Sequence, residues 1–230
     1  MFSDKEKIAM NRHFYLMIDT ETAGGLDNPL VYDLGMQVVD RHGNVYAEYN
    51  LVISDVFYGM PEKMNTAYYA DKLPQYFEEI EKGIRKVVSW DYAKSLVAYL
   101  CNYYSIKAII AHNARFDYNA CNNTSTVLKG FKSYFFTFGI PVWCTYTMAK
   151  QTVGKQKAYI EWCRKHGFVT KNGQPKLTAE VLYRYISRDL TFIEKHTGLE
   201  DVKIERLIFK WIMRQHKAMR RTYYTERKAA

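Results

Sequence analysis

The sequence predicts an α/β fold, a mixed five-stranded sheet flanked by helices. Three observations predict it. The chain up to Ile53 consists of three β-type runs, two of them joined by a hairpin turn. Helical periodicity then dominates, interrupted by two short apolar runs that suit buried strands. The remainder of the chain is again helical in pattern. Hairpins make antiparallel neighbours and strand–helix–strand units make parallel ones, so the expected sheet is mixed.

The N-terminal strands are predicted by short apolar or β-rich runs and by the breakers between them. The residue pair Gly43-Asn44 is a turn signal between two such runs, which predicts an antiparallel hairpin. An irregular segment is expected over Ser54–Leu73, because Gly59-Met60-Pro61 interrupts any regular pattern there. The three expected strands are His13–Asp19, Val31–Asp40 and Val45–Ile53.

The later elements follow from apolar residues spaced three and four apart, the period of a helix with one buried face. The expected strands are Lys107–Ala111 and Pro141–Thr145. The expected helices are Tyr76–Val88, Tyr92–Tyr104, Phe116–Leu128, Gln156–His166, Thr178–Ile186 and Leu199–Tyr224. No linker or repeat divides the 230 residues, so residues 1–230 are interpreted as a single domain with a basic C-terminal helix and tail at about 199–230.

The charge of the chain is concentrated in two segments. The net charge is +9, of which residues 150–176 carry +6 and residues 203–228 carry +7, so the rest is slightly acidic. A basic surplus indicates an anionic partner such as nucleic acid. Five cations recur at steps of three and four and are candidate contacts to a nucleic-acid backbone, although a solvated helix face would look the same: Lys203, Arg206, Lys210, Arg214 and Lys217.

The cysteines and the N-terminus predict the compartment. The four cysteines form no C-x-x-C pair, which argues against a zinc ribbon or dithiol site and favours small buried thiols in a reducing environment. The charged first ten residues lack the apolar region of a signal peptide, and the longest uncharged run, Ser133–Ala149, contains Gly139 and Pro141. We therefore expect a cytoplasmic protein without a membrane span.

Two carboxylates stand where the first strand is expected to end. Asp19 and Glu21 form a D-x-E pattern, and side chains two apart on a strand point to one face. Two hard oxygen ligands aimed at one point suit Mg²⁺ or Mn²⁺. The pattern alone is weak, because Asp4-Lys5-Glu6 repeats it on a charged segment. Only the first pair follows an apolar run, which predicts a metal site there.

Two further segments place a histidine five positions before an aspartate. His112 and Asp117 lie in HNARFD, after an expected strand and at the start of a helix. His196 and Asp201 lie in HTGLED, at the start of the last helix. A helix-start aspartate is often only a cap, so neither spacing is decisive alone. The second segment stands before a long amphipathic helix, which favours a functional histidine there.

Taken in order, IDTET (18–22), HNARFD (112–117) and HTGLED (196–201) resemble the DEDDh-type 3′–5′ exonucleases, which include proofreading exonucleases and RNase T-like enzymes. The resemblance implies an RNase H-like fold and hydrolysis of phosphodiester bonds at a 3′ end. It implies two Mg²⁺ or Mn²⁺ ions held by four acids, Asp19, Glu21, Asp117 and Asp201. It implies that His196 is the general base. The chain departs from the family after the acid pair, where Glu21-Thr22-Ala23-Gly24-Gly25-Leu26 carries extra residues.

Residues beside the acids are candidates for holding the substrate end: Thr22, Leu26, Asn113 and Phe116. The expected substrate is the 3′ end of single-stranded DNA, released as nucleoside monophosphates, with proofreading beside a DNA polymerase in replication as a candidate role. Two alternatives remain open at this point. The chain would be an exoribonuclease trimming RNA 3′ ends, or a catalytically silent nucleic-acid-binding accessory of a polymerase.

Overall fold

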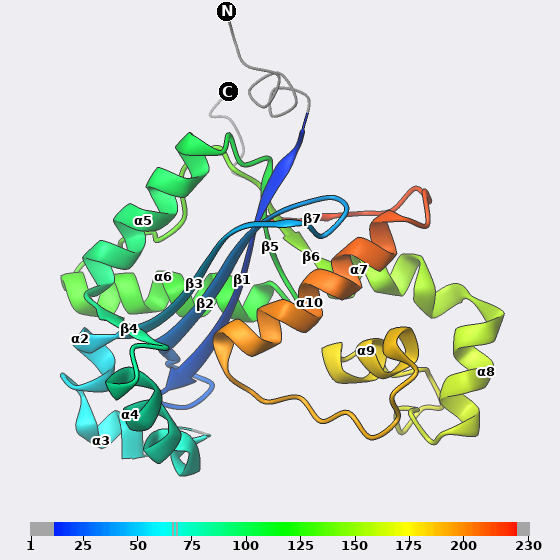
Figure 1. The fold of residues 1–230 in the computed structure, drawn as a ribbon, viewed down its shortest axis with the longest axis horizontal. Coiled ribbons are helices and arrows are strands. Elements are labelled where there is room, and N and C mark those ends of the chain that lie inside the picture. Colours follow the sequence, from blue (N-terminus) through cyan, green and yellow to red (C-terminus); the bar gives the residue numbers. More distant parts are fainter. Residues whose placement is uncertain (1–11, 66, 68, 225–230) are drawn as a thin grey trace, which may run out of the picture.

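A computed structural model describes residues 12–65, 67 and 69–224 and contains one seven-stranded mixed sheet (Figure 1). The strand order is β4-β3-β2-β1-β5-β6-β7. The neighbours β1/β2, β2/β3 and β6/β7 are antiparallel, whereas β1/β5, β5/β6 and β3/β4 are parallel. The strands are β1 Phe14–Ala23, β2 Leu30–Asp40, β3 Val45–Ile53, β4 Lys86–Val88, β5 Ala108–Ala111, β6 Val142–Cys144 and β7 Thr222–Tyr224.

The sheet has seven strands where five were predicted, and the two missed strands are its edges. The predicted helix Tyr76–Val88 was too long, because α4 (Leu73–Glu81) ends before Gly83, which adopts a φ of +71°. Residues Lys86–Val88 then pair with β3. Three-residue strands carry little pattern of their own, so their state depends on the strand beside them.

The last helix was also predicted too long, since α10 spans Gly198–Met213 and not Leu199–Tyr224. His216 has a φ of +49°, a backbone conformation incompatible with a continuing helix. The chain turns back after it, and β7 pairs antiparallel with β6. The prediction that the remainder of the chain is helical is therefore wrong at this edge of the sheet.

Helices cover both faces of the sheet (Figure 1). On one face lie α5 Trp90–Tyr103 and α6 Arg115–Lys129. On the other lie α7 Thr145–Gln151, α8 Lys157–Lys165, α9 Ala179–Ser187 and α10. The segment expected to be irregular contains three short helices, α2 Ser54–Phe57, α3 Pro61–Asn65 and η1 Ala70–Lys72, and a further turn, η2, covers Val153–Lys155. No helix among the described residues is long and apolar enough to cross a membrane.

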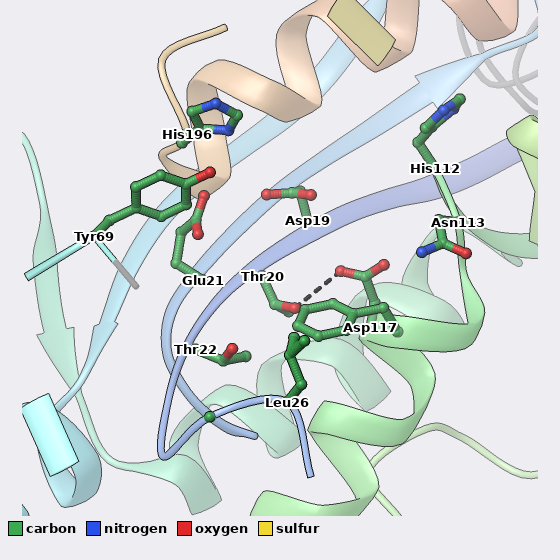
Figure 2. A pocket seen from close by; sticks show the side chains of 12 residues that line it. Asp19, Thr20, Glu21, Thr22, Leu26, Tyr69, His112, Asn113, Asp117 and His196 are labelled. Carbon is green, nitrogen blue, oxygen red and sulfur yellow. Dashed lines mark hydrogen bonds between the residues drawn. The ribbon is translucent and has the colours of Figure 1, made fainter. Parts of the chain in front are cut away.

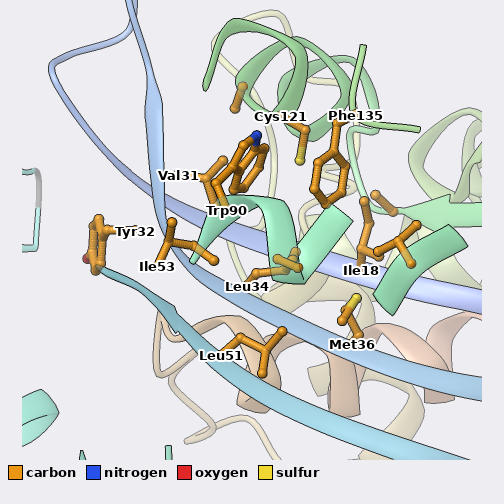
Figure 3. Packing of buried hydrophobic residues seen from close by; sticks show 14 of the residues in the cluster. Ile18, Val31, Tyr32, Leu34, Met36, Leu51, Ile53, Trp90, Cys121 and Phe135 are labelled. Carbon is orange, nitrogen blue, oxygen red and sulfur yellow. The ribbon is translucent and has the colours of Figure 1, made fainter. Parts of the chain in front are cut away.

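The core between the sheet and α5/α6 is built from aliphatic and aromatic side chains (Figure 3). The Trp90 ring stacks on Phe135 with centroids 4.4 Å apart, and its indole nitrogen donates to the Ser125 hydroxyl at 2.9 Å. A buried indole keeps its polar atom satisfied in this way. All four cysteines are buried free thiols, as the sequence predicted.

Helix α10 contacts the opposite face at unusually close range. A Cβ atom on Gly35 of β2 would lie 2.1 Å from the carbonyl carbon of Gly198. A Cβ atom on Gly198 would lie 2.6 Å from the Gly35 nitrogen and 3.2 Å from the Asp19 carbonyl oxygen. Two glycines therefore allow the first turn of α10 to rest directly on β1 and β2 at Asp19.

Candidate active site

Strand β1 places Asp19 and Glu21 on the α10 face of the sheet. The predicted strand ended at Asp19, but β1 continues to Ala23, so both acids lie inside it. Its pairing with β5 stops at Met17, while its pairing with β2 continues. The part of β1 that carries the two acids is therefore bare on one flank, which leaves room for a site.

The first turn of α10 brings a third carboxylate to this place. Asp201 is only 4% exposed. One oxygen each of Asp19, Glu21 and Asp201 lie within 4.8 Å of one another. Three hard oxygen donors at this spacing fit a divalent cation such as Mg²⁺ or Mn²⁺. The donor set and its geometry are thus suited to the metals that the sequence indicated.

Asp117 approaches from the other face of the sheet, at the start of α6. Its Oδ1 accepts a hydrogen bond from the Thr20 hydroxyl at 2.9 Å. Thr20 points opposite to Asp19 and Glu21 because side chains alternate along a strand. The hydroxyl thus positions one carboxylate oxygen, and sequence reasoning missed this contact.

A pocket of about 410 Å³ opens over these groups (Figure 2). Tyr69 and His196 lie on the side nearest Glu21, and Asn113 lies beside Asp117. Asp201 is buried beside the acid pair and does not line the opening. The lining residues are Asp19, Thr20, Glu21, Thr22, Gly25, Leu26, Tyr69, His112, Asn113, Phe116, Asp117 and His196.

Burial and mutual repulsion disfavour the charged forms of the carboxyl groups. Burial raises the pKa of Asp19 well above its usual range, and the negative charges of Glu205 and the other acids raise it further. Burial raises the pKa of Glu21 to about 9, with Asp33 and Asp201 adding to the effect. Burial likewise raises the pKa of Asp117 to about 7 and, together with Glu194, that of Asp201 to about 8. A divalent cation at this place would favour the charged carboxylates and offset their mutual repulsion, so the group of acids is suited to cations.

Glu205 is a fifth carboxylate at the site, which sequence reasoning missed. It is 3% exposed and lies one helical turn after Asp201 on α10. Its Oε2 accepts from the backbone N–H of His112 at 3.3 Å. A signal existed, because a carboxylate four residues after Asp201 shares its helix face.

Asp33 holds the start of α10 in place and was also missed. Its Oδ2 accepts the Gly198 N–H at 3.0 Å, the Tyr76 hydroxyl at 2.6 Å and an Arg85 nitrogen at 2.8 Å. Asp33 has no exposed surface and pairs with Glu21 across β1 and β2. A lone acid within the apolar run of β2 was the available signal, since a buried carboxylate needs partners.

His196 borders the pocket on the loop before α10. It adopts a φ of +50°, which is uncommon for a residue other than glycine. Its ring stacks on Tyr69 with centroids 4.6 Å apart and planes 12° apart. The Lys72 ammonium donates to the backbone carbonyls of Lys195 and, at 3.2 Å, His196. Burial, together with the Lys72 charge, lowers the pKa of His196.

His112 lies in a different environment. Its Nδ1 is 2.9 Å from the Thr145 hydroxyl and its Nε2 is 2.8 Å from the Leu177 carbonyl oxygen. Both ring nitrogens are thus occupied within the fold, and burial lowers the pKa of the imidazole to about 4. In Figure 2 the ring points away from the acids. His112 is therefore a structural histidine, although it stands at the same H-x₄-D spacing from Asp117 as His196 does from Asp201.

The four residues expected to hold the substrate end all line the pocket, namely Thr22, Leu26, Asn113 and Phe116. Leu26 is 87% exposed, on the loop between β1 and β2 that contains the extra glycines. Asn113 adopts a φ of +58° at the turn before α6. An apolar side chain this exposed at a pocket rim is available for contact with a ligand.

The five basic candidates do not form one continuous helical stripe. Lys203 pairs with Glu200 at 2.6 Å, and Arg206 donates to the Gly43 carbonyl at 2.6 Å. Lys210 lies beside the same hairpin turn. Arg214 is the exposed cap of α10, and Lys217 lies beyond its end. The row of cations at steps of three and four is therefore interrupted, because α10 ends at Met213 and because Arg206 and Lys210 lie against the β2–β3 turn.

Solved structures confirm the fold. A 3′-exonuclease solved for its 3′-end specific recognition of the histone mRNA stem-loop has a TM-score of 0.59 and 8% identity, covering 94% of this chain and 72% of that chain. A full-length 3′-exonuclease has a TM-score of 0.58 and 8% identity, with 91% and 85% covered. A zinc-bound complex of E. coli exonuclease I with single-stranded DNA has a TM-score of 0.53 and 15% identity, with 90% and 41% covered.

No family model matches the chain, and no curated protein sequence matches it. The likeness therefore lies in the fold: the α/β architecture implied by the sequence resemblance is the one found in 3′-exonucleases. Because one fold can carry many activities, the chemistry has to be argued from the residues of the pocket.

Proposed function

We propose that this protein is a metal-dependent 3′–5′ exonuclease that hydrolyses the terminal phosphodiester bond of a nucleic-acid strand. One observation carries the proposal. Acids from three segments far apart in the sequence meet at one end of β1, and His196 borders the same pocket. The structure neighbours that share the fold are themselves described as 3′-exonucleases, which supports both the reaction class and its polarity.

Asp19, Glu21 and Asp201 are the residues that would hold a divalent cation, and Asp117 would complete the site from the α6 side. We propose that the site would hold two Mg²⁺ or Mn²⁺ ions, with Asp19 among their ligands, because Asp19 lies near enough to the other acids for their charges to raise its pKa. Such ions, when bound, stabilise the negative charge that gathers on the phosphate during in-line displacement. The four acids would offset most of the ions' charge and set their positions.

His196 is the proposed general base. Its imidazole borders the pocket, and its lowered pKa keeps it neutral, and able to accept a proton, at neutral pH. Tyr69 stacks on one ring face, and Lys72 holds the backbone carbonyl of the same residue. We propose that these two contacts orient the ring toward an attacking water.

The rim of the pocket is the proposed binding place for the terminal nucleotide. Leu26 and Phe116 offer apolar surface for the base, while Thr22 and Asn113 offer hydrogen-bonding groups for the sugar. The exposure of Leu26 supports this role, because contact with a base would remove its apolar surface from water.

Single-stranded DNA is the proposed substrate, with RNA as the second candidate. Exonuclease I, which shares the fold, was solved with single-stranded DNA. The RNA alternative is favoured by the neighbour with the highest TM-score given above, which was solved for its recognition of the histone mRNA stem-loop. A silent accessory module is disfavoured. The chain has a carboxylate at each of the four proposed metal-ligand positions and a histidine at the proposed base position, and these five side chains lie in or beside one pocket.

A narrower form of the proposal is proofreading beside a DNA polymerase. The exposed cations of residues 150–176, mostly on and around α8, are a candidate surface for such a partner or for nucleic acid. We also propose that residues 1–230 act as one exonuclease domain in the cytoplasm. The single sheet, which has buried hydrophobic residues packed on both faces, supports the first point, and four unpaired cysteines support the second.

Digestion of matched 5′-labelled DNA and RNA strands tests the proposal. With Mn²⁺ present, we expect a ladder that shortens from the 3′ end, and no cleavage in EDTA. The Asp19→Asn variant should leave both strands intact, while Asp91→Asn, an exposed acid on α5, should cleave like the wild type. The faster substrate identifies the preferred nucleic acid. Cleavage by Asp19→Asn at the wild-type rate would show that the acids are not the catalytic site.

A further inference from the structure

A second, basic groove lies at the far end of α10 from the acids. Its volume is about 360 Å³, and its cations come from two separate parts of the chain. Arg41 belongs to the turn after β2, while Lys217 and Arg221 belong to the segment between α10 and β7. No acidic residue of the described chain lines it; the other lining residues are Met213, His216, Ala218 and Met219.

The segment that forms the groove is held in place by hydrogen bonds from neighbouring elements. The Gln156 side chain donates to Gln215 at 2.8 Å, and the Arg220 N–H donates to the Gln151 side chain at 2.7 Å. The Cys144 N–H donates to the Arg221 carbonyl at 2.9 Å. The cations thus project from a fixed backbone, which favours a built binding surface over a loose tail.

The positive charges of the groove have no acidic partner. Within the described part of the chain, no salt bridge reaches Arg41, Lys217 or Arg221. Arg221 lies over the Trp143 ring at 5.2 Å. Burial raises the pKa of the Tyr15 hydroxyl, while Arg221 and Arg41 act to lower it, so both guanidinium groups lie near that phenol. Like charges gathered without a counterion repel one another unless an anion binds between them.

The position of the groove relative to the acids suggests what the anion is. The 16 residues of α10 separate the two places, which is about 24 Å at 1.5 Å per residue. At about 3.4 Å per nucleotide along a stacked strand, that distance corresponds to roughly seven nucleotides, and to fewer in an extended strand. Arg206 and Lys210 lie along the helix between them and provide further positive charge. Figure 1 shows α10 running from the acid-bearing part of β1 toward the segment before β7.

We propose that this groove binds backbone phosphates of the single-stranded substrate several nucleotides upstream of the 3′ end held at the acids. The inference deepens the proposed exonuclease function and rests on it for the position of the 3′ end. Arg41 and Lys217 are the groups that contact phosphate, since both are exposed and lack a protein partner in the described structure.

Binding of a labelled 20-nucleotide DNA strand in EDTA tests the groove without any turnover. Neutralising Arg41 and Lys217 together (R41Q/K217Q) should weaken binding roughly tenfold at low salt and reduce the slope of log Kd against log salt by about 1.4. The matched control removes two exposed charges at the opposite edge of the sheet (K82Q/K86Q) and should bind like the wild type. If DNA binding weakened equally in both variants, the proposal for the groove would be wrong, because the change in net charge alone would then explain the loss of affinity.

Strand length provides a second test. With Mn²⁺, R41Q/K217Q should raise the KM of a 20-nucleotide strand several-fold while leaving the KM of a 4-nucleotide strand unchanged. A short strand held at the acids cannot reach a groove about 24 Å away. A parallel rise for both lengths would place the two cations elsewhere on the path and refute the inference. If the wild type cleaves neither strand, the exonuclease proposal fails, whereas the EDTA measurement still decides whether the groove binds nucleic acid.

Discussion

The two histidine–aspartate pairs have identical spacing and opposite environments. His112 precedes Asp117 across the turn from β5 into α6, and His196 precedes Asp201 across the turn into α10. Both aspartates reach the acid cluster, one from each face of the sheet. Only one histidine borders the pocket in a position to act, because both ring nitrogens of His112 have partners in the fold.

The difference shows that a motif assigns its carboxylate more reliably than its imidazole. A strand end or a helix start positions the backbone, which brings a short side chain such as aspartate to a predictable place. The direction of a histidine ring depends on which groups surround it. Tyr69 and Lys72 surround His196, and Thr145 and Leu177 surround His112; all four come from other segments.

The largest effect is expected from substituting the aspartates, because both histidine–aspartate pairs contribute their carboxylate to the acid cluster. Asp117→Asn and Asp201→Asn should each reduce kcat at least about 10³-fold, since losing a cation ligand removes several kcal/mol of transition-state stabilisation. Neither variant should lower the melting temperature of the metal-free protein, because burial raises the pKa of both carboxyls and the neutral amide avoids that penalty. Steady-state kinetics and calorimetry check this. Activity near wild type in one variant alone would exclude that aspartate from the site.

Substituting the histidines should separate the two pairs. His196→Gln should lower kcat about 10²- to 10⁴-fold, the range for a general base, with little change in unfolding free energy. His112→Gln should instead cost about 2 kcal/mol of stability by breaking two hydrogen bonds, while kcat falls far less. Denaturant titration and turnover of the same preparations provide the comparison. If His112→Gln lost turnover and His196→Gln lost stability, His112 would be the general base and His196 the structural histidine.

The pH dependence of stability should distinguish His112 as well. Its folded-state pKa of about 4 lies below the ordinary value of about 6.5, so the unfolded chain binds the proton more readily in that interval. The stability of the wild type relative to His112→Gln is greatest above pH 6.5 and falls by up to about 3 kcal/mol as the pH approaches 4, enough to cancel the advantage of the neutral ring. The raised carboxyl pKa values act in the opposite sense, so the quantity to measure is the difference between wild type and His112→Gln. A stability difference that does not narrow on acidification would contradict the assignment.

The smallest expected effect concerns the surroundings of His196. The Lys72 charge helps to lower the pKa of this imidazole, so Lys72→Gln should raise it and move the acid limb of the kcat profile to higher pH. Near neutral pH the loss should be only a few-fold. Lys82→Gln, a surface lysine on the same segment paired with Glu78, is the control. An acid limb that stays in place in Lys72→Gln would mean that another group limits the rate.

Much of the fold was predictable because its signals are local. Strand β3 was predicted with the bounds it has, since the Gly43-Asn44 turn and the β-rich run determine it within a short stretch. Helices α5 and α6 were predicted to within two residues because each has a long apolar period. The missed strands β4 and β7 span three residues each and pair with strands far away in the sequence.

The candidate site divides in the same way. The four acids, His196 and three of the rim residues were predicted from three motifs, and Leu26 from the loop after the first motif; the structure brings them to one place. Thr20, Asp33, Tyr69, Lys72 and Glu205 were not predicted. Each of these acts through a contact with a distant segment, and no spacing in the chain encodes that contact.

The sequence by itself determined which groups are present and on which elements they stand: acids on the first strand and at two helix starts, and a basic surplus in two later segments. The tertiary structure decided which histidine faces the acids, that a fifth carboxylate joins them, and that the basic residues gather in a groove at the far end of α10. The physical reason is the distance along the chain over which each effect acts. Backbone preferences act over a few residues, whereas burial and charge depend on whatever segments the packing brings together.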